Sequence, residues 1–217
     1  MNIFKTDIFG LKFEKRYQNY KDDKDWLSNE YGYLHEKIKE EFSEKDKIIL
    51  LECINKLKEK KSFNNILEIG VYRSSLTGGK EASSTQFLLN KKPVETKYLG
   101  VDANAACVSN IVNHSQNIFG INCRSQDHDK VCKYMRQIGM NTIDLLIIDG
   151  WHSINQLYLD FKYTELLSEK GIVFFHDTNY HPGPKNLLEC VDDNLFKIRK
   201  FYEGEEDWGV AYIERIM

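Results

Sequence analysis

The segment 66-ILEIGVYRSS-75 is an apolar run that breaks at a glycine and continues into small polar residues. The run predicts a buried strand, and Gly70 allows a tight turn at its end. The layout is that of a nucleotide-binding loop. However, only one glycine of G-x-G-x-x-G is present, and no Gly-Lys-Ser/Thr ending of a P-loop follows. Glu68 precedes that glycine by two residues, and its carboxylate favours a cationic ligand over a phosphate; a plain turn with an incidental acid is the alternative.

Strand and helix patterns alternate on the C-terminal side of this segment. This alternation predicts an α/β fold, a Rossmann-like doubly wound sheet of seven mostly parallel strands with a C-terminal antiparallel hairpin. On the N-terminal side, Ser43 and Asp46 resemble a capping box at the start of a helix. The predicted strands are 66–72, 97–103, 118–125, 143–150, 171–177, 196–204 and 208–216, and the predicted helices are 84–90, 104–115, 130–139 and 153–168, with Gly139 and Gly171 as the ends of the last two.

We divide the chain of 217 residues into an arm and one domain. Residues 1–42 are expected to form a helical N-terminal arm or cap, and residues 43–217 the ligand-binding domain. The net charge is −3, so no basic excess supports binding to nucleic acid. The five cysteines form no C-x-x-C pair, and the sequence has neither a signal-peptide h-region nor an apolar run of membrane-spanning length. We therefore expect a cytoplasmic protein without membrane association.

Ligands of doubly wound sheets bind beyond the carboxyl ends of the strands, which directs attention to the residues that follow each strand. Asp102 follows the second parallel strand, where a carboxylate can accept hydrogen bonds from a ribose diol; capping the next helix is its alternative role. Asp144 lies at the opposite end of its strand and is expected to be structural. Glu68 and Asp102 together indicate a nucleoside with a cationic tail, which is S-adenosylmethionine rather than NAD.

Four segments carry a resemblance to a known family. They are LEIGVYRSS, YLGVDAN, IDLLIIDGWHS with Asp160 downstream, and LLSEKGIVFFHDT. The sequence resembles the class I S-adenosylmethionine-dependent methyltransferases, and among them the small O-methyltransferases that act on sugars and secondary metabolites, over residues 64–213. The resemblance implies S-adenosylmethionine as cofactor.

The resemblance also implies a set of cofactor-binding residues. Glu68 and Gly70 would lie at the methionine part, Asp102 at the ribose, and Ser125 with its two successors near the adenine. The sequence departs from the family at Ser74, where glycine is usual, and at the inserted residues 76–83. The implied set is Glu68, Gly70, Tyr72, Ser74, Asp102, Ala103, Gln126, Asp127 and Asp149.

The residues after the fourth and fifth parallel strands are the candidates for chemistry. Asp149-Gly150-Trp151-His152 stands where amine-directed relatives often carry Asn/Asp-Pro-Pro-Tyr/Phe/Trp, which favours an oxygen nucleophile. His152 with Asp149 is the candidate catalytic pair, in which His152 acts as general base; holding Asp149 or capping the next helix is its alternative role. Asp149 and Asp177, with His176 between the strand and Asp177, form a candidate site for Mg²⁺ or another divalent cation, softer than a usual magnesium site.

The leading hypothesis is an O-methyltransferase that moves a methyl group to a hydroxyl of a sugar or another small hydroxylated metabolite. Two alternatives stay open: an N-methyltransferase for an amino sugar, and a cofactor-binding module without turnover. The N-terminal arm is expected to cover the site or to form a homo-oligomer contact. His181, in a proline-rich loop, either lines the substrate site or belongs to an ordinary surface turn.

Overall fold

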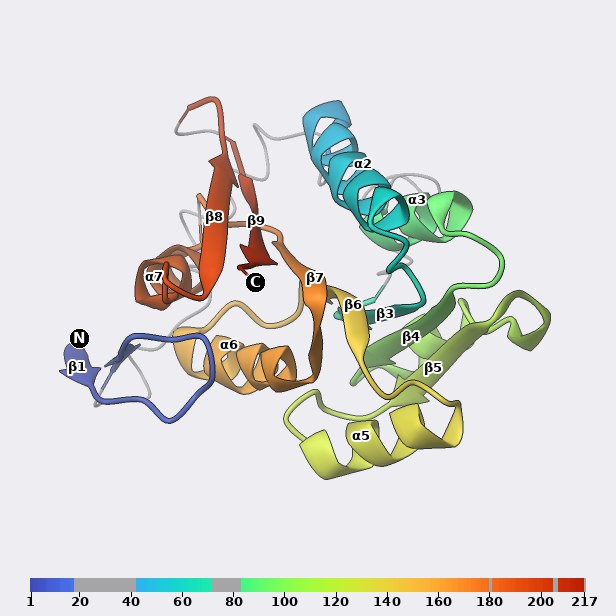
Figure 1. The fold of residues 1–217 in the computed structure, drawn as a ribbon. Coiled ribbons are helices and arrows are strands. Elements are labelled where there is room, and N and C mark those ends of the chain that lie inside the picture. The colour runs from blue at the N-terminus through green and yellow to red at the C-terminus, as the bar shows by residue number, and fades with distance from the viewer. Residues whose placement is uncertain (18–41, 72–82, 180, 205–206, 217) are drawn as a thin grey trace.

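The computed structural model describes residues 1–17, 42–71, 83–179, 181–204 and 207–216. A seven-stranded sheet lies at its centre (Figure 1). The strand order is β5-β4-β3-β6-β7-β9-β8. Strands β3 to β7 pair in parallel, and β9 runs antiparallel to both β7 and β8. The predicted sheet and its C-terminal hairpin are confirmed. The strands are β3 (Asn65–Ile69), β4 (Lys97–Asp102), β5 (Ile118–Asn122), β6 (Ile143–Ile148), β7 (Leu167–Phe175), β8 (Phe196–Phe201) and β9 (Val210–Arg215).

Helices cover both faces of this sheet (Figure 1). Helices α2, α3 and α4 bury their apolar side chains in a cluster on one face, whereas α5, α6 and α7 contribute to a cluster on the other. Gly139 follows α5 with φ of 72°, which confirms the predicted helix end. The helices are α2 (Glu44–Glu59), α3 (Ser84–Lys91), α4 (Ala105–Ser109), α5 (His128–Gln137), α6 (Ile154–Phe161) and α7 (Pro182–Cys190).

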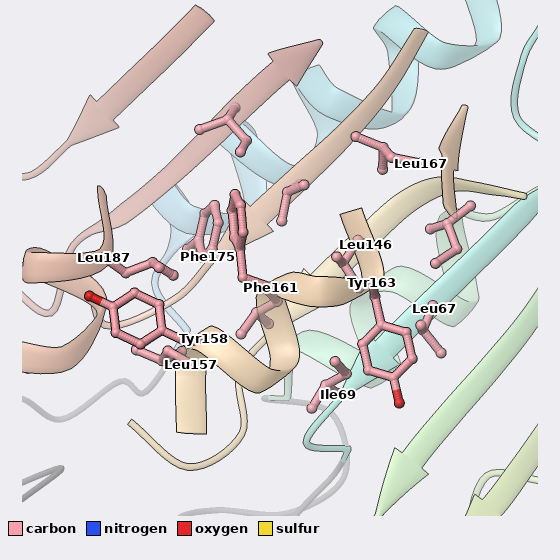
Figure 2. Packing of buried hydrophobic residues seen from close by; sticks show 14 of the residues in the cluster. Leu67, Ile69, Leu146, Leu157, Tyr158, Phe161, Tyr163, Leu167, Phe175 and Leu187 are labelled. Atoms are coloured by element: carbon pink, nitrogen blue, oxygen red, sulfur yellow. The ribbon is translucent and has the colours of Figure 1, made fainter. Parts of the chain in front are cut away.

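Strand β6 lies at the centre of the sheet, and all six of its residues are buried. Successive side chains of a strand point to opposite faces. Leu145 and Ile147 therefore join the cluster beneath α2, while Leu146 and Ile148 join the cluster beneath α6. Figure 2 shows Leu146 with the aromatic side chains of the second cluster, among them Phe161 and Phe175. Burial on both faces explains why this segment is a continuous apolar run rather than an alternating one.

The helix predicted over 153–168 is shorter than expected, and its predicted end at Gly171 is wrong. Helix α6 stops at Phe161, a 3-10 helix covers Lys162–Leu166, and β7 begins at Leu167. The register of β7 against β6 shifts within this stretch. Gly171 lies in the irregular part of the strand, where a Cβ would approach Leu167 Cγ to 2.5 Å. Glycine at position 171 therefore allows an irregularity in the strand, and the sequence alone does not distinguish this from the end of a helix.

Residues 1–17 of the N-terminal arm form strands instead of the expected helix. Strands β1 (Asn2–Phe4) and β2 (Glu14–Arg16) pair in an antiparallel two-stranded sheet. Ile8 and Leu11, between them, join the same apolar cluster as α6 and α7, and this burial holds the segment on the domain. Residues 18–41 of the predicted arm lie outside the described residues, so the boundary at residue 42 stays a prediction.

Two acids predicted from local pattern take the expected structural roles. Ser43 and Asp46 form the capping box of α2. Asp144 accepts hydrogen bonds from the backbone N–H groups of Asn64 and Asn65 and from the Ser168 hydroxyl. Asp144 thus ties the start of β3 to β6, at the edge opposite to the ligand-binding edge.

Among the described residues, no helix combines the length and the apolarity that crossing a bilayer requires. All five cysteines, each of which lies in a described segment, are free thiols.

The substitution Leu146→Ala tests the packing of the sheet centre. Leu146 has no exposed surface, so truncation leaves a cavity and should lower the free energy of unfolding by about 2–5 kcal/mol, measured by urea denaturation. Val94→Ala, at a side chain that is 71% exposed, is the control and should change it by less than about 0.5 kcal/mol. Equal effects of the two substitutions would contradict this packing.

Candidate functional site

The loop after β3 lies directly against the end of β6. Gly70 has φ of 81°, and a Cβ at this position would lie 2.1 Å from the carbonyl oxygen of Asp149. Two backbone hydrogen bonds hold the approach, from Gly70 N–H to Val101 O and from Asp149 N–H to Ile69 O. Only glycine meets both the left-handed conformation and this close contact. Gly70 therefore brings the ends of β3, β4 and β6 together at one edge.

Glu68 differs from the exposed acid that the sequence suggested. The side chain is fully buried, and its two oxygens accept hydrogen bonds from the hydroxyls of Tyr98 and Thr85. Burial raises the pKa of Glu68 to about 8. Neither oxygen is exposed to a cationic ligand in the described structure, so the residue occupies a supporting position beneath the loop. Glu68 is buried because it lies within β3 among buried apolar residues, and not in the loop that follows the strand.

Asp102 stands at the end of β4, partly exposed. One carboxylate oxygen accepts from Val71 N–H at 3.1 Å and the other from Asn104 N–H at 2.7 Å. The N-cap of α4 is Asn104, whose side chain accepts from Ala106 N–H. The alternative role of Asp102 as helix cap is therefore wrong. Its contacts instead join the loops after β3 and β4, and the partly exposed carboxylate keeps lone pairs for a ligand.

The other residues of the expected cofactor set are spread along the same edge. Ala103, Gln126 and Asp127 are exposed. Ser125 is held by Gln156, whose amide donates to its hydroxyl at 3.0 Å. Tyr72 and Ser74 lie outside the described residues, as does nearly all of the insertion at 76–83.

Two histidines and two aspartates meet at the ends of β6 and β7. His176 Nδ1 lies 2.9 Å from Asp177 Oδ1 and 3.7 Å from Asp149 Oδ1. His152 Nε2 lies 3.3 Å from Asp177 Oδ2 and 3.7 Å from Asp149 Oδ1. Each imidazole thus faces both carboxylates. The three residues of the expected metal site, Asp149, His176 and Asp177, offer ligand atoms within 4.8 Å of one another.

Charge within this cluster outweighs burial. Burial alone would lower the pKa of each imidazole and raise that of Asp177. The carboxylates of Asp177 and Asp149 nevertheless raise the pKa of His152 and of His176 above the ordinary value. The imidazolium groups in turn lower the pKa of Asp177. The cluster is therefore a compact set of opposite charges in a buried place, which is the arrangement expected of a functional site.

Backbone packing sets the positions of His152 and Asp177. Asp177 has φ of 57°, a left-handed conformation that few residues other than glycine adopt. The start of α7 packs on His152, because a Cβ at Gly183 would lie 1.7 Å from its carbonyl oxygen. The rings of His152 and His181 lie 4.4 Å apart, and Trp208 stacks on His181. His181 is 1% exposed, so the interpretation as a surface turn is wrong.

Two neighbours of the site escaped the sequence analysis as functional residues. Asp46 was recognised only as a helix cap, yet its Oδ2 lies 3.9 Å from His176 Nε2. Trp208 packs against His181, and His181 forms with His152 and Asp177 a second group that could hold a metal. Only the pairing of β7 with β9 brings Trp208 to this edge, and no local pattern signals it.

Similarity to solved structures shows that the chain shares its fold with several methyltransferases. The MycE methyltransferase of the mycinamycin biosynthetic pathway, solved with Mg and SAH, superposes with a TM-score of 0.52 at 17% sequence identity. The matched region covers 76% of this chain and 48% of MycE, so the chain spans about half the length of that protein.

Two bacterial structures of more similar length also match. A putative caffeoyl-CoA O-methyltransferase from Staphylococcus aureus has a TM-score of 0.52 and 15% identity, over 77% of this chain and 83% of that one. A putative rRNA methylase from Clostridium thermocellum has a TM-score of 0.51 and 15% identity, over 77% and 97%. No family model and no curated protein sequence matches the chain. At these identities the similarity establishes the fold.

The burial of Glu68 predicts a pH dependence of stability. Its pKa of about 8 in the folded chain lies above the ordinary 4.5, so the folded state holds a proton that the unfolded state releases. The contribution of Glu68 is fully present below pH 4.5 and is lost as pH rises towards about 8. Urea denaturation of Glu68→Gln should show a smaller fall in the free energy of unfolding over this range than the parent chain.

Glu169→Gln, at an exposed position of β7, is the matched control and should keep the fall of the parent chain. An unchanged pH profile in Glu68→Gln would contradict the protonated state of the buried acid.

Proposed function

We propose that this chain is an S-adenosylmethionine-dependent O-methyltransferase that acts on a hydroxyl of a sugar or another small hydroxylated metabolite. The observation that carries the proposal is the cluster of Asp149, His152, His176 and Asp177 at the ligand-binding edge, 3.7 Å or less between each imidazole and the carboxylates. On the fold of class I methyltransferases, this edge is where a cofactor and an acceptor would meet.

The cofactor would bind across the ends of β3, β4 and β5. Gly70 keeps the backbone of its loop free of side-chain bulk, and the partly exposed carboxylate of Asp102 would accept the ribose hydroxyls. Gln126, Asp127 and Ala103 are exposed where the adenine would lie. Glu68 would act indirectly, by fixing Tyr98 and Thr85 beneath the loop. When bound, S-adenosylmethionine supplies a methyl group that is already activated on a sulfonium.

The cluster also suits a divalent cation. Asp149, His176 and Asp177 offer two carboxylates and one imidazole from two adjacent strand ends. His152 Nε2 is buried and has no hydrogen-bond partner among the described residues, although it points between two carboxylates. A cation held by Asp149, His176 and Asp177 would lower the pKa of an acceptor hydroxyl and orient it. The residues thus fit a metal, with Mg²⁺ or another divalent ion as the candidates.

His152 would accept the proton that the acceptor hydroxyl loses. Asp177 and Asp149 raise its pKa against the effect of burial, so the imidazole must lose its own proton before it can act as the base. The contact with His181 restricts its ring, and the packing of α7 fixes its backbone. A fixed base aligned with the acceptor oxygen is what an in-line methyl transfer to an alcohol requires.

The small-molecule acceptor is favoured over RNA by the charge of the chain. One similar structure contains MycE with Mycinamycin VI, and others are rRNA methylases by name. The present chain has 30 basic and 33 acidic residues, which gives no excess of positive charge for a phosphate backbone. An amino-sugar N-methyltransferase and a cofactor-binding module without turnover are the alternatives that experiments must separate.

We also propose a cellular location for the protein and a role for its N-terminal segment. Five free thiols are compatible with the reducing cytoplasm, where we place the protein. Residues 1–42 would act as a cap or as a contact between copies of the chain.

Cofactor binding can be tested by thermal shift with S-adenosylhomocysteine, the product form of the cofactor. At a concentration of about 100 times Kd the melting temperature should rise by about 5–10 °C. Asp102→Asn should reduce this shift, whereas Asp193→Asn, at an exposed side chain, should keep it. Stabilisation by NAD without stabilisation by S-adenosylhomocysteine would refute the proposal.

The role of His152 can be tested by His152→Ala with a panel of monosaccharides, nucleotide sugars and amino sugars as acceptors. We expect kcat for a hydroxyl acceptor to fall about 10²- to 10⁴-fold, while the thermal shift by S-adenosylhomocysteine is retained. The measurement is transfer of a radiolabelled methyl group. His114→Ala, at an exposed position, should retain full turnover.

The same assay separates the alternatives. Turnover on an amino sugar that survives His152→Ala would favour an amine acceptor, because a neutral amine needs no strong base. Cofactor binding without transfer to any acceptor in the panel would favour the binding module.

A further inference from the structure

Asp46 lies close to His176 as well as to Ser43, its partner in the capping box of α2. Its Oδ2 accepts hydrogen bonds from the backbone N–H and the hydroxyl of Ser43 at 2.9 and 2.8 Å. Its Oδ1 is buried and has no hydrogen-bond partner among the described residues. The residue is 3% exposed, and its Oδ2 lies 3.9 Å from His176 Nε2. Helix capping therefore accounts for only one of the two carboxylate oxygens.

His176 is held between Asp46 and the cluster at the end of β7. Its Nδ1 faces Asp177 and Asp149, while its Nε2 faces Asp46 and lacks a hydrogen-bond partner in the described structure. The ring of Phe42 lies 5.8 Å from the imidazole, so the residues at the start of α2 enclose it. His176 is 6% exposed. One nitrogen is thus available to an ion in the cluster, and the other to a buried carboxylate.

This arrangement is close to the one that metal-binding histidines generally have, with 3.9 Å between Nε2 and Asp46 Oδ2 where a hydrogen bond needs about 3 Å. Such a histidine donates its second ring N–H to a carboxylate, carbonyl or water, which fixes the ring and makes the ligating nitrogen more basic. Imidazole ligands suit Zn²⁺, Fe²⁺, Ni²⁺ and Cu²⁺, and Mn²⁺ is the weakest binder of the first-row transition series, whereas Mg²⁺ prefers oxygen ligands. A well-oriented imidazole among two carboxylates should therefore shift the preference of the site away from Mg²⁺.

We propose that His176, oriented by Asp46, makes this centre select a first-row transition-metal ion over Mg²⁺. His176 would supply Nδ1 to the ion, Asp149 and Asp177 would supply carboxylate oxygens, and Asp46 Oδ2, 3.9 Å away in this structure, would move closer and accept a hydrogen bond from the Nε2–H of His176. The inference rests on the metal site of the proposed function. It adds the class of metal and gives Asp46 the role of a positioning residue.

Metal selectivity is tested by calorimetric titration of the whole chain with Mn²⁺ and with Mg²⁺. The ratio of the two affinities should fall at least about tenfold in His176→Glu, which replaces the imidazole with a carboxylate. Electron spin-echo spectroscopy of the Mn²⁺-loaded chain should show nitrogen couplings that weaken in the same variant. An unchanged affinity ratio with unchanged nitrogen couplings would overturn the assignment of His176.

The role of Asp46 is tested by Asp46→Asn, with Ser43→Ala as the matched control. Asparagine can place its one oxygen where Oδ2 accepts from Ser43, but it loses the negative charge that faces His176. Asp46→Asn should weaken Mn²⁺ binding about 10- to 100-fold. Ser43→Ala removes a capping hydroxyl and should leave Mn²⁺ binding within about twofold. Equal losses in both variants would show that only the stability of α2 matters and would overturn the positioning role.

The outcomes distinguish this inference from the proposed function. If the chain binds neither Mn²⁺ nor Mg²⁺ but is stabilised by S-adenosylhomocysteine, the metal inference fails while the cofactor site stands. If it binds Mn²⁺ with nitrogen couplings but shows no stabilisation by S-adenosylhomocysteine, the metal inference stands and the proposed methyl transfer fails.

Discussion

The close approach of Gly70 to the carbonyl of Asp149 is the contact on which the candidate site depends. A side chain at residue 70 would collide with the end of β6 at 2.1 Å, and the loop after β3 would have to move away from Asp149. Without that contact the expected cofactor loop and the reactive carboxylate would no longer share one edge. The parallel pairing of β3 with β4 and β6 then brings Asp102 to the same edge. A single glycine thus couples the loop proposed to bind the cofactor to the position of Asp149.

The buried cluster holds charged groups of opposite sign next to one another. Four ionisable side chains lie within ion-pair distance at the ends of β6 and β7, and two of them are imidazoles with raised pKa. Buried charges are costly unless they are paired. Here the two carboxylates and the two imidazoles supply that pairing for one another. A divalent ion would take over the positive charge, so the cluster can be stable in both the metal-free and the metal-bound state.

Most of the fold was predictable because its signals are local. Continuous apolar runs marked the buried strands, Ser43 and Gly139 marked helix ends, and the order of the segments implied a parallel sheet. The prediction failed where two structures share one signal. Gly171 serves a strand irregularity instead of a helix end, and Asn2–Phe4 pairs with Glu14–Arg16 in a segment that the burial of Ile8 and Leu11 holds on the domain. Local pattern does not report such packing between distant segments.

The same distinction applies to the site. The sequence by itself determined that Asp102, Asp149, His152, His176 and Asp177 follow strands, and parallel strands bring such residues to one edge. Only the tertiary structure decided which of them touch, and with what burial. It placed Glu68 in the core with Tyr98 and Thr85, and it brought Asp46 to His176 from the start of α2. Residues 46 and 176 are joined only by helix α2 packing on β7, a contact between segments far apart in the chain.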